Sequence, residues 1–547
     1  MPLWLLFFTL ALFSLKDDSP TMDEQNHLAR GAALVRTGDP RLSVEHPPVA
    51  NGLSGLMLLL LPDLRLPTDH PSWEQTDGWY LFADQFLWVY NQDVPRIVFL
   101  GRLAMVFLTM GLSLVGYHLA KRLWGGPAGI LALAFLLFDP NIIAHGRYVT
   151  TDVAGATFLL LALLLLHRLW SAPGWSWPRL LWASLGLALA WGSKLSNLAF
   201  VPILGLLAIL PLYRGRAGRN LLAYGLAGLL SIPILWLFFA LEWGPFRFAG
   251  DVPWLLSLNQ FSGPMPTFWQ GVERMLLLGS DSGRTSFLLG ETKTGGFLLY
   301  FPIAFMVKTP LLTIVALLVA AVWLGRRPGS RPATVFLLVP LLLFFGLMLT
   351  NSLNIGYRHL LPMLPLAYVL IAGLAGRRVA DGGAVAPAGL NLAVYLLPFT
   401  LTVALLSVSL AIYPHYLSYF NVIGGGPANG YNILIDSNVD WGQDLLRLQD
   451  WMAENEVDSV KLGWFGSARP EYYGINYEPL PGLPHHLNLF WDPPFDPQNP
   501  APGIYAISVS ILWEIPLQEK GLFAWFRARE PDARIGYSIF IYEVPEP

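Results

Sequence analysis

Long apolar runs recur along this chain and dominate what it can fold into. A helix of about 17–25 mostly apolar residues can cross a bilayer. Charged residues make up 13% of the chain, against about 25% in soluble domains. We therefore predict a polytopic α-helical membrane protein with about eleven spans. The runs lie near Leu3–Leu15, Ile97–Ala120, Ala128–Ile143, Val153–Leu166, Leu180–Trp191, Leu198–Leu212, Leu221–Leu241, Pro310–Leu324, Ala333–Leu349, Leu360–Leu374 and Ala393–Tyr413.

The first run, Leu3–Leu15, has two interpretations, a signal peptide or a first span. No basic segment precedes it, and the sequence FSLKDDSP at its end contains no small-x-small cleavage site. The run is short for a span. We expect a retained first span rather than a cleaved leader.

Basic residues in alternate connections indicate the orientation. Because short cytoplasmic loops are enriched in Lys and Arg, these connections are predicted to lie in the cytoplasm. With an odd number of spans, the N-terminus is then inside and the C-terminus outside. The basic connections carry Lys121-Arg122, Arg168 with Arg179, Arg214-Arg216-Arg219, Arg326-Arg327-Arg331 and Arg377-Arg378.

Past Tyr413 the leucine runs give way to polar residues and turn signals. We predict a membrane domain over residues 1–420, with long outer loops over 16–96 and 242–296. Residues 421–547 are predicted to form an extracytoplasmic α/β domain, which is long enough for a core of its own. Its expected elements are strands at Asn432–Ile435, Ser459–Trp464, Gly503–Val509 and Gly536–Val544 and a helix at Gln443–Glu454.

Two predicted outer loops contain carboxylates that can carry chemistry. Asp23 and Glu24 follow the first run, where a carboxylate can accept a proton from an incoming hydroxyl. A helix N-cap is the alternative role. The second loop holds His145, Arg147 and Asp152, and Asp152 has the same alternative, since it precedes an apolar run.

Four cationic or imidazole groups lie where the predicted spans meet the outer side. Lys194 and Lys308 can bind an anionic ligand, or they can extend to lipid phosphates. Arg358, followed by His359, begins a span, and a guanidinium can bind a phosphate through two hydrogen bonds. Cations beside a carboxylate base suit group transfer from a lipid phosphate.

Several functional classes are excluded. The chain has no cysteine, so disulfides, thiolate metal sites and cysteine nucleophiles are absent. The net charge of −3 gives no indication of a nucleic-acid partner. No His/Cys metal spacing, glycine-rich phosphate loop or nucleophile elbow is found in the sequence.

Several motifs resemble a bacterial branch of the C-type glycosyltransferase superfamily, also called GT-C. The resemblance is to the family of protein O-mannosyltransferases and the aminoarabinose transferase of lipid A. Its motifs are the acidic pair Asp23-Glu24, the HPP segment His46-Pro47-Pro48, and HGRYVTTD, which ends at Asp152. Further resemblance lies in YFPIAFMVKTPL, NIGYRHLLPMLP and YLSYFNVIGGGPANGYNILIDSNVDWGQDL.

The resemblance implies a GT-C fold and an inverting transfer from a polyprenyl-phosphate sugar to an acceptor hydroxyl. The acceptor is a glycan, lipid or protein on the outer side of the bacterial cytoplasmic membrane. No cofactor is expected, and a divalent metal is left open. The family pattern gives catalytic roles to Asp23, Glu24 and Asp152, acceptor-side roles to His46, His145 and Arg147, and donor-phosphate binding to Lys194, Lys308, Arg358 and His359. The distinctive segment Asp436–Leu445 receives no role.

A transporter or flippase for a lipid-linked sugar is the main alternative function. Transporters place ionisable residues near the bilayer midplane and often contain internal repeats. Here the ionisable residues gather at the predicted outer ends, and the sequence shows no repeat. A non-catalytic scaffold, whose outer domain binds a partner, is a third hypothesis. The transferase hypothesis is favoured because it uses both the acidic outer loop and the outer cations.

Overall fold

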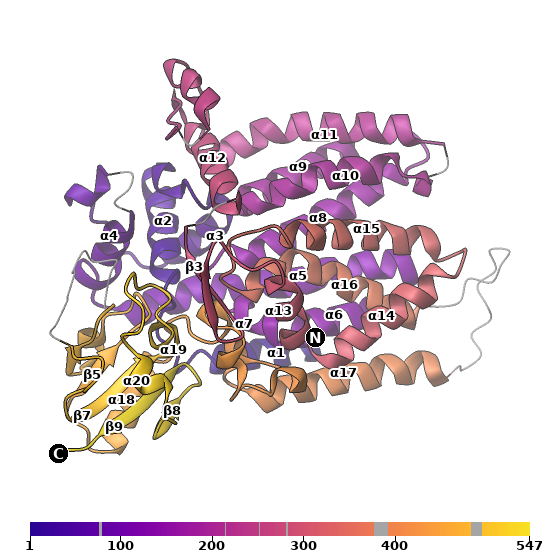
Figure 1. Cartoon of the computed structure of the whole chain (residues 1–547). Helices are drawn as coiled ribbons and strands as arrows, with labels where there is room; N and C mark the ends of the chain where they lie inside the picture. The colour runs from indigo at the N-terminus through magenta and orange to yellow at the C-terminus, as the bar shows by residue number, and fades with distance from the viewer. Residues whose placement is uncertain are drawn as a thin grey trace.

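The chain folds into a body of apolar helices with a small mixed sheet at one end (Figure 1). The computed structural model describes residues 1–75, 79–213, 215–250, 252–280, 283–376, 392–482 and 495–546. The apolar helices are α1 (Pro2–Phe13), α5 (Val94–Trp124), α6 (Gly126–Phe138), α7 (Pro140–Gly146), α8 (Asp152–Trp170), α9 (Trp177–Ser193), α10 (Phe200–Ile209), α11 (Ala217–Phe238), α13 (Tyr300–Lys308), α14 (Leu311–Gly325), α15 (Arg331–Met348), α16 (Leu364–Ala372) and α17 (Leu392–Ile412).

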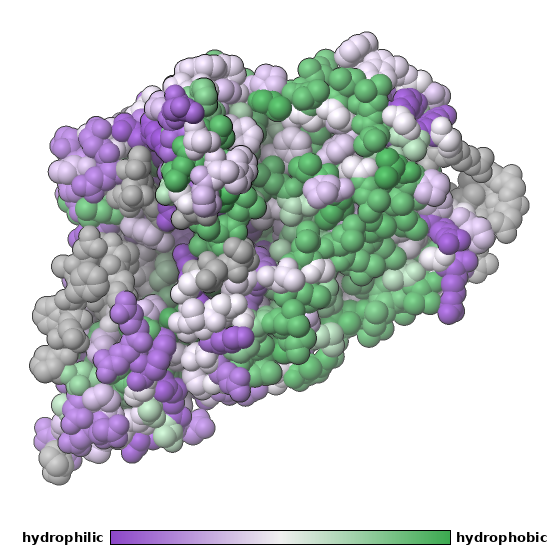
Figure 2. All heavy atoms as spheres, turned by 45° about the horizontal axis from the view of Figure 1, so that its top comes forward, coloured by the Kyte–Doolittle hydropathy of each residue, from purple (hydrophilic) through white to green (hydrophobic). Residues whose placement is uncertain are grey.

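Each apolar run of the sequence coincides with one or two of these helices. Among the described residues, four helices are long and apolar enough to cross a membrane: α5, α8, α11 and α15. The number rises to six if the bent pairs α6–α7 and α13–α14 each count as one span. Figure 2 shows a wide band of apolar side chains over the helical body. The chain is thus a multi-pass membrane protein, and the count of eleven spans stays a prediction.

The run predicted as one span over Ala128–Ile143 is broken. Helices α6 and α7 meet at an angle of 61°. At the break, Oδ1 of Asp139 accepts hydrogen bonds from the amides of Asn141 (2.9 Å) and Ile142 (3.1 Å), and Pro140 begins α7. An aspartate N-cap followed by proline at the first helical position starts a new helix. The site loop before Asp152 is therefore partly helical.

The sheet and the basic connections lie at opposite ends of the molecule. In Figure 1 the sheet lies at the lower left with α2 and α4 above it, whereas the junction of α14 and α15 and the start of α11 lie on the right. This separation is the one that the positive-inside prediction requires. Which end faces the cytoplasm stays a prediction, and Arg214 and Arg377-Arg378 lie outside the described residues.

The predicted outer loop over residues 16–96 is folded rather than extended. It contains α2 (Glu24–Thr37), α3 (Pro48–Leu58) and α4 (Trp79–Asp84), which continues as a π-helix to Val89. Helices α2 and α3 touch through backbone: a Cβ at Gly31 would lie 2.1 Å from the carbonyl oxygen of Asn51, and one at Gly55 would lie 2.2 Å from that of Gly31. Glycine at both positions permits this approach.

The described residues of the second predicted outer loop, 242–296, contain two pairs of short strands, a 3-10 helix at Pro253–Gln260 and an α-helix. The pairs β1 with β2 and β3 with β4 are antiparallel. The elements are β1 (Trp243–Pro245), β2 (Ser262–Pro264), α12 (Pro266–Ser280), β3 (Thr285–Leu288) and β4 (Glu291–Thr294).

The C-terminal part holds a five-stranded sheet in the order β6-β5-β7-β9-β8. Strand β5 runs parallel to β6 and β7, whereas β9 is antiparallel to β7 and β8. The elements are β5 (Val460–Gly463), β6 (Tyr477–Pro479), β7 (Gly503–Ser508), β8 (Ala533–Ile535), β9 (Ile539–Val544), α18 (Leu445–Glu454), α19 (Val509–Leu512) and α20 (Ala524–Arg527).

One predicted strand is wrong. Residues Asn432–Ile435 form no strand, because a turn satisfies their backbone locally. The amides of Ile433 and Leu434 both donate to the carbonyl of Gly430, at 2.9 and 3.0 Å. The other three predicted strands and the predicted helix are present, with boundaries that differ by a few residues.

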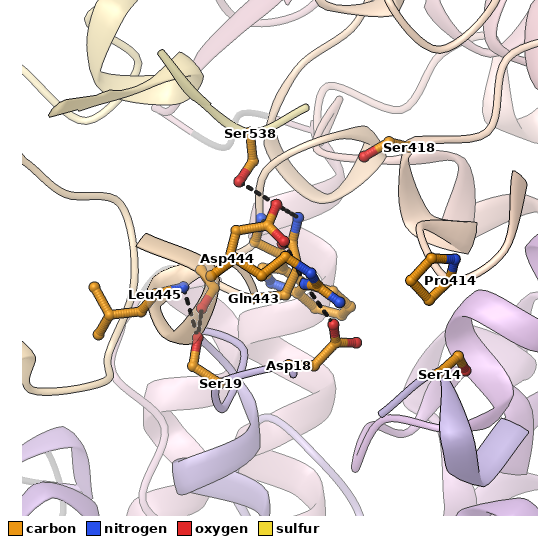
Figure 3. Close-up of polar contacts among 12 residues, drawn as sticks. Ser14, Asp18, Ser19, Pro414, Ser418, Gln443, Asp444, Leu445 and Ser538 are labelled. Carbon is orange, nitrogen blue, oxygen red and sulfur yellow. Dashed lines mark hydrogen bonds and ion pairs between the residues drawn. The ribbon is translucent and has the colours of Figure 1, made fainter. Parts of the chain in front are cut away.

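The C-terminal part and the first outer loop are held together by polar contacts and by a shared hydrophobic core. Figure 3 shows Asp18 and Ser19 lying beside Gln443, Asp444 and Ser538. The backbone amide of Ser19 donates to the carbonyl of Gln443 at 2.9 Å. The core contains Leu28 and Phe86 from the outer loop together with residues of α18 and β9. The predicted boundary at residue 421 therefore runs between parts that pack against each other.

Candidate active site

Asp23 lines a cavity of about 1300 Å³ between the helical body and the C-terminal part. It is the N-cap of α2, but its side chain makes no capping hydrogen bond. Arg358 and Asp436 line the same cavity, and so do Trp464–Ser467, which follow β5. A carboxylate, a guanidinium and open space thus meet at one point, as a reaction site requires.

Arg358 is the centre of the charged groups. Its Nη1 lies 2.9 Å from Oδ2 of Asp23 and 3.7 Å from Oδ2 of Asp152. The guanidinium lies over the ring of Trp441, 4.4 Å from the centroid. Burial lowers the pKa of Arg358, but Asp23 and Asp152 outweigh burial and hold it above its usual value. The group is therefore a fixed cation that two carboxylates share.

The backbone around Arg358 is fixed by the segment Asp436–Leu445. The amide of Tyr357 donates to Oδ1 of Asn438 at 2.9 Å, and the hydroxyl of Ser437 donates to the carbonyl of Ile355. A Cβ at Gly356 would lie 2.2 Å from that hydroxyl oxygen. The segment that sequence left without a role thus positions the central cation.

Lys194 completes an alternating row of charges. It follows α9, and its ammonium pairs with Asp152 at the start of α8. Gly155 leaves room for it, since a Cβ there would lie 3.0 Å from Cβ of Lys194. The four charges alternate in sign and their sum is zero, in the order Asp23, Arg358, Asp152 and Lys194.

Two of the predicted histidines, His46 and His359, lie near these charges. His46 also contacts His27, which was not predicted: their rings are 4.7 Å apart, and Nδ1 of His27 is 2.9 Å from Oδ1 of Asn51. Burial holds the pKa of His46 well below its usual value, and His27 and Arg358 lower it further. Burial, followed by Lys194 and Arg358, also holds the pKa of His359 well below its usual value. The imidazoles of His46 and His359 are therefore neutral near pH 7, and each can donate one hydrogen bond and accept another.

His145 does not line the cavity, but it packs against Trp441, which does. It belongs to α7, and its ring centroid is 5.9 Å from that of Trp441. Its side chain is buried and its Nδ1 has no hydrogen-bond partner among the described residues. The acceptor-side role of His145 stays a prediction.

Glu24 lies away from the cavity, although its neighbour Asp23 lines it. Its carboxylate is bound by Nε and Nη2 of Arg102, at 2.9 and 2.7 Å. The amides of Thr21 and Val149 donate to the same carboxylate, at 2.8 and 3.0 Å. A fully buried carboxylate with four donors has no capacity left for a substrate proton. The contacts of Glu24 are thus structural, and its catalytic role stays a prediction.

Arg147 does not line the cavity either. Its Nη1 donates to the carbonyl of Ser14 at 2.6 Å and lies 3.0 Å from the carboxylate of Asp18. The guanidinium packs against the rings of Tyr148 and Tyr416. These contacts join the end of α1 to the helical body, and the acceptor-side role of Arg147 stays a prediction.

Lys308 does not reach the cavity either. Its ammonium donates to the carbonyls of Leu417 (2.7 Å) and Asn438 (2.6 Å) and lies 4.8 Å from the ring centroid of Phe420. The side chain is buried. Lys308 therefore supports the segment around Asn438, and its role in binding the donor phosphate stays a prediction.

Asp436 and Trp441 are site residues that sequence reasoning missed. Asp436 lines the cavity and adopts a left-handed backbone conformation, with φ of 58°. Burial raises the pKa of its carboxyl to about 6, although Arg358 opposes this shift. Such backbone strain is uncommon and concentrates at functional sites. The distinctive sequence around them was the available signal, but it did not indicate proximity to Asp23.

One stretch of the chain matches the model of a known protein family. Residues 91–239 match the family model described as dolichyl-phosphate-mannose-protein mannosyltransferase. Asp152 and Lys194 lie within this stretch, whereas Asp23 and Arg358 lie outside it. No curated protein matches the sequence significantly.

Solved structures similar to this one include ArnT from Cupriavidus metallidurans bound to undecaprenyl phosphate. The two chains are 13% identical, with 98% of this chain and 97% of ArnT covered and a TM-score of 0.48. The oligosaccharyltransferase AglB from Archaeoglobus fulgidus, in complex with an inhibitory peptide and a dolichol-phosphate, is 13% identical, with 91% and 61% covered and a TM-score of 0.40. Over residues 91–239, the match to the mannosyltransferase model agrees with the resemblance to protein O-mannosyltransferases drawn from the sequence.

Proposed function

We propose that this protein is an inverting glycosyltransferase that moves a sugar from a polyprenyl-phosphate donor to an acceptor hydroxyl. One observation carries the proposal: Asp23 lies 2.9 Å from Arg358 at the wall of a cavity of about 1300 Å³. The mannosyltransferase match over residues 91–239 supports it. The reaction would take place on the outer side of a bacterial cytoplasmic membrane, with a glycan, lipid or protein acceptor.

In this proposal Asp23 is the general base. It takes the proton of the acceptor hydroxyl while the hydroxyl oxygen attacks the anomeric carbon from the face opposite the phosphate. The bond between that carbon and the phosphate oxygen breaks, and polyprenyl phosphate leaves. General base catalysis of this kind contributes about 10²–10⁴-fold to a rate.

Arg358 and Lys194 stabilise the leaving phosphate. Arg358 pairs with Asp23 in this structure. A donor phosphate can replace Asp23 as the partner of Arg358, so that donor binding would leave the Asp23 carboxylate available to the acceptor hydroxyl. Asp152 keeps both cations in place, since it contacts Arg358 at 3.7 Å and pairs with Lys194. Fixed cations at a position where negative charge develops lower the barrier.

The proposal needs no metal, because the two cations neutralise the two carboxylates. Within the described ranges, no group of three or more His, Asp or Glu side chains could hold a metal ion. Addition of a chelator is expected to leave turnover unchanged.

The test is turnover by the full chain in lipid nanodiscs with a panel of undecaprenyl-phosphate monosaccharides. Mass spectrometry would follow loss of the donor and appearance of a glycosylated product in an extract of cell-envelope acceptors. We expect Asp23→Asn to lower turnover by about 10²–10⁴-fold. Asp450→Asn, an exposed change on α18, is the matched control.

Two outcomes would contradict the proposal. Undiminished turnover in Asp23→Asn would remove Asp23 as the base. Movement of the lipid-linked sugar across the membrane without a new glycosidic bond would favour the flippase instead.

A further inference from the structure

A second cavity, of about 620 Å³, lies between α8 and α9 near the end of α5. Its lining residue Arg168 is sixteen residues beyond Asp152 on α8, which at 1.5 Å per residue is about 24 Å along the helix. The cavity is therefore at the end of the molecule remote from the candidate active site. It takes no part in the proposed transfer.

The lining residues form two facing stripes. On α8 the stripe is Leu161, Leu165 and Arg168, at intervals of four and three residues. Residues at these intervals share one face of a helix. Because α8 ends just beyond Arg168, the arginine lies at the edge of the helical body and Leu161 lies about 10 Å deeper.

Helix α9 mirrors this arrangement. Its stripe is Arg179, Trp182 and Leu185, at intervals of three residues from the start of the helix. The two helices pack closely, since a Cβ at Gly186 would lie 2.9 Å from Leu165. The cavity is thus a groove with guanidinium groups at its mouth and leucines along its depth.

The mouth of the groove carries positive charge. Arg168 and Arg179 are exposed, and neither has an ion pair within the part of the chain that the structure describes. A third guanidinium, that of Arg122, is held in place by Nδ1 of His167 (3.0 Å) and the hydroxyl of Ser171 (2.7 Å). None of the described lining residues is Asp or Glu. Converging guanidiniums are suited to a phosphate group.

The depth of the groove is apolar and faces the membrane. Trp182 is 60% exposed and its neighbour Leu181 is 55% exposed, and Figure 2 shows that apolar side chains cover the helical body. Tryptophan is enriched where a membrane protein meets the headgroup region. A free phosphate would use the arginines alone, whereas a lipid would also use the leucines.

We propose that this groove binds an anionic phospholipid, with its phosphate on Arg122, Arg168 and Arg179 and one acyl chain along the leucines. Basic pockets between membrane helices bind anionic headgroups in this way. The inference is independent of the proposed transferase function, because it rests on residues that have no part in that reaction.

Native mass spectrometry of the full chain tests the proposal. The probes are phosphatidylglycerol and phosphatidylcholine with identical acyl chains, undecaprenyl phosphate, and inorganic phosphate. We expect the wild-type protein to retain phosphatidylglycerol. The double variant Arg168→Gln with Arg179→Gln should bind it about tenfold or more weakly, because two charge-assisted contacts are lost. The control is Arg326→Gln with Arg331→Gln, which removes the same charge at the junction of α14 and α15.

A photoactivatable phosphatidylglycerol gives a second measurement on the wild-type protein in membranes. Crosslinked peptides should come from α8 and α9. Equal binding of the two phospholipids, unchanged binding in the double variant, or crosslinks confined to other helices would overturn the proposal. Tighter binding of undecaprenyl phosphate than of phosphatidylglycerol would overturn the proposal in favour of a site for the carrier lipid. Full displacement of the phospholipid by inorganic phosphate would overturn it in favour of a site for a free anion.

Discussion

Neighbouring residues of the same chemical type have opposite roles at the start of α2. Asp23 lines the cavity and shares Arg358, whereas Glu24 is enclosed by Arg102 and two backbone amides. Successive residues at a helix start point in different directions. Two adjacent acidic residues in a sequence can therefore have different surroundings, one in a cavity and the other buried in the protein. Their order in the chain does not show which residue faces the cavity.

The support role of Glu24 predicts a loss of stability. Glu24→Gln leaves the buried Arg102 without its carboxylate, and breaking a buried ion pair from one side costs about 3–5 kcal/mol. We expect a clearly lower melting temperature for this variant in nanodiscs. Asp23→Asn should melt near the wild-type temperature, because Asp23 is partly exposed to the cavity. Equal melting temperatures for all three proteins would contradict this assignment.

At the scale of elements, the contact between α2 and α3 predicts a sharp difference between two glycines of α3. Gly55→Ala forces its Cβ against the carbonyl oxygen of Gly31, at 2.2 Å, so the helices must separate. Gly52→Ala meets only a side-chain carbon, at 3.8 Å. We expect Gly55→Ala to lose about 1–3 kcal/mol through overpacking and to lose turnover through displacement of Asp23. Gly52→Ala, the matched control, should keep its stability and its turnover. Wild-type stability and turnover in Gly55→Ala would contradict the close contact between α2 and α3.

The segment Asp436–Leu445 predicts a pH dependence. Burial raises the pKa of Asp440 to about 7, although the amide of Ser510 donates to its carboxylate at 3.0 Å. An acid with a raised pKa in the folded state binds its proton more tightly there. Its contribution to stability is therefore full below about pH 4 and is lost as the pH rises through about 7.

Asp440→Asn tests this dependence, because the amide resembles the protonated acid. We expect its melting temperature to exceed that of wild type at pH 8 and to approach it at pH 5. Asp450→Asn, on the exposed face of α18, should change neither value. A difference from wild type that is the same at both pH values would show that Asp440 does not titrate in this range.

For the whole molecule, the sequence predicted those features that depend on the pattern of residues within one segment. The apolar runs became helices, because hydropathy and helix length are properties of one segment. Arg358, Asp152 and Lys194 were predicted as parts of one site and lie together. Sequence did not predict the buried partners of Arg147 and Lys308, because a charge reveals nothing about which distant group will neutralise it. Asp436 was missed for the same reason, since its place in the site depends on how the C-terminal part packs against α2.

The last prediction concerns Asp18, a buried carboxylate at the contact between the C-terminal part and the helical body. Asp18 lies 3.0 Å from Arg147 and 2.8 Å from Arg447, and it accepts a hydrogen bond from Tyr148 at 2.6 Å. Burial acts to raise the pKa of Asp18, but Arg147 and Arg447 outweigh it and hold the pKa below its usual value. Asp18 therefore joins α1, the helical body and α18 while it is ionised.

Asp18→Asn leaves two guanidiniums without this shared partner, and we expect a loss of about 3–5 kcal/mol. We expect the contact between the C-terminal part and the helical body to weaken first, because Asp18, Arg147 and Arg447 form part of it. Limited proteolysis should then cut near residues 421–445 before the helices. Asp17→Asn changes the adjacent, more exposed carboxylate and should give the wild-type pattern. Simultaneous proteolysis of the C-terminal part and the helices would contradict this prediction. It would mean that the two parts unfold as one unit because of the hydrophobic core that they share.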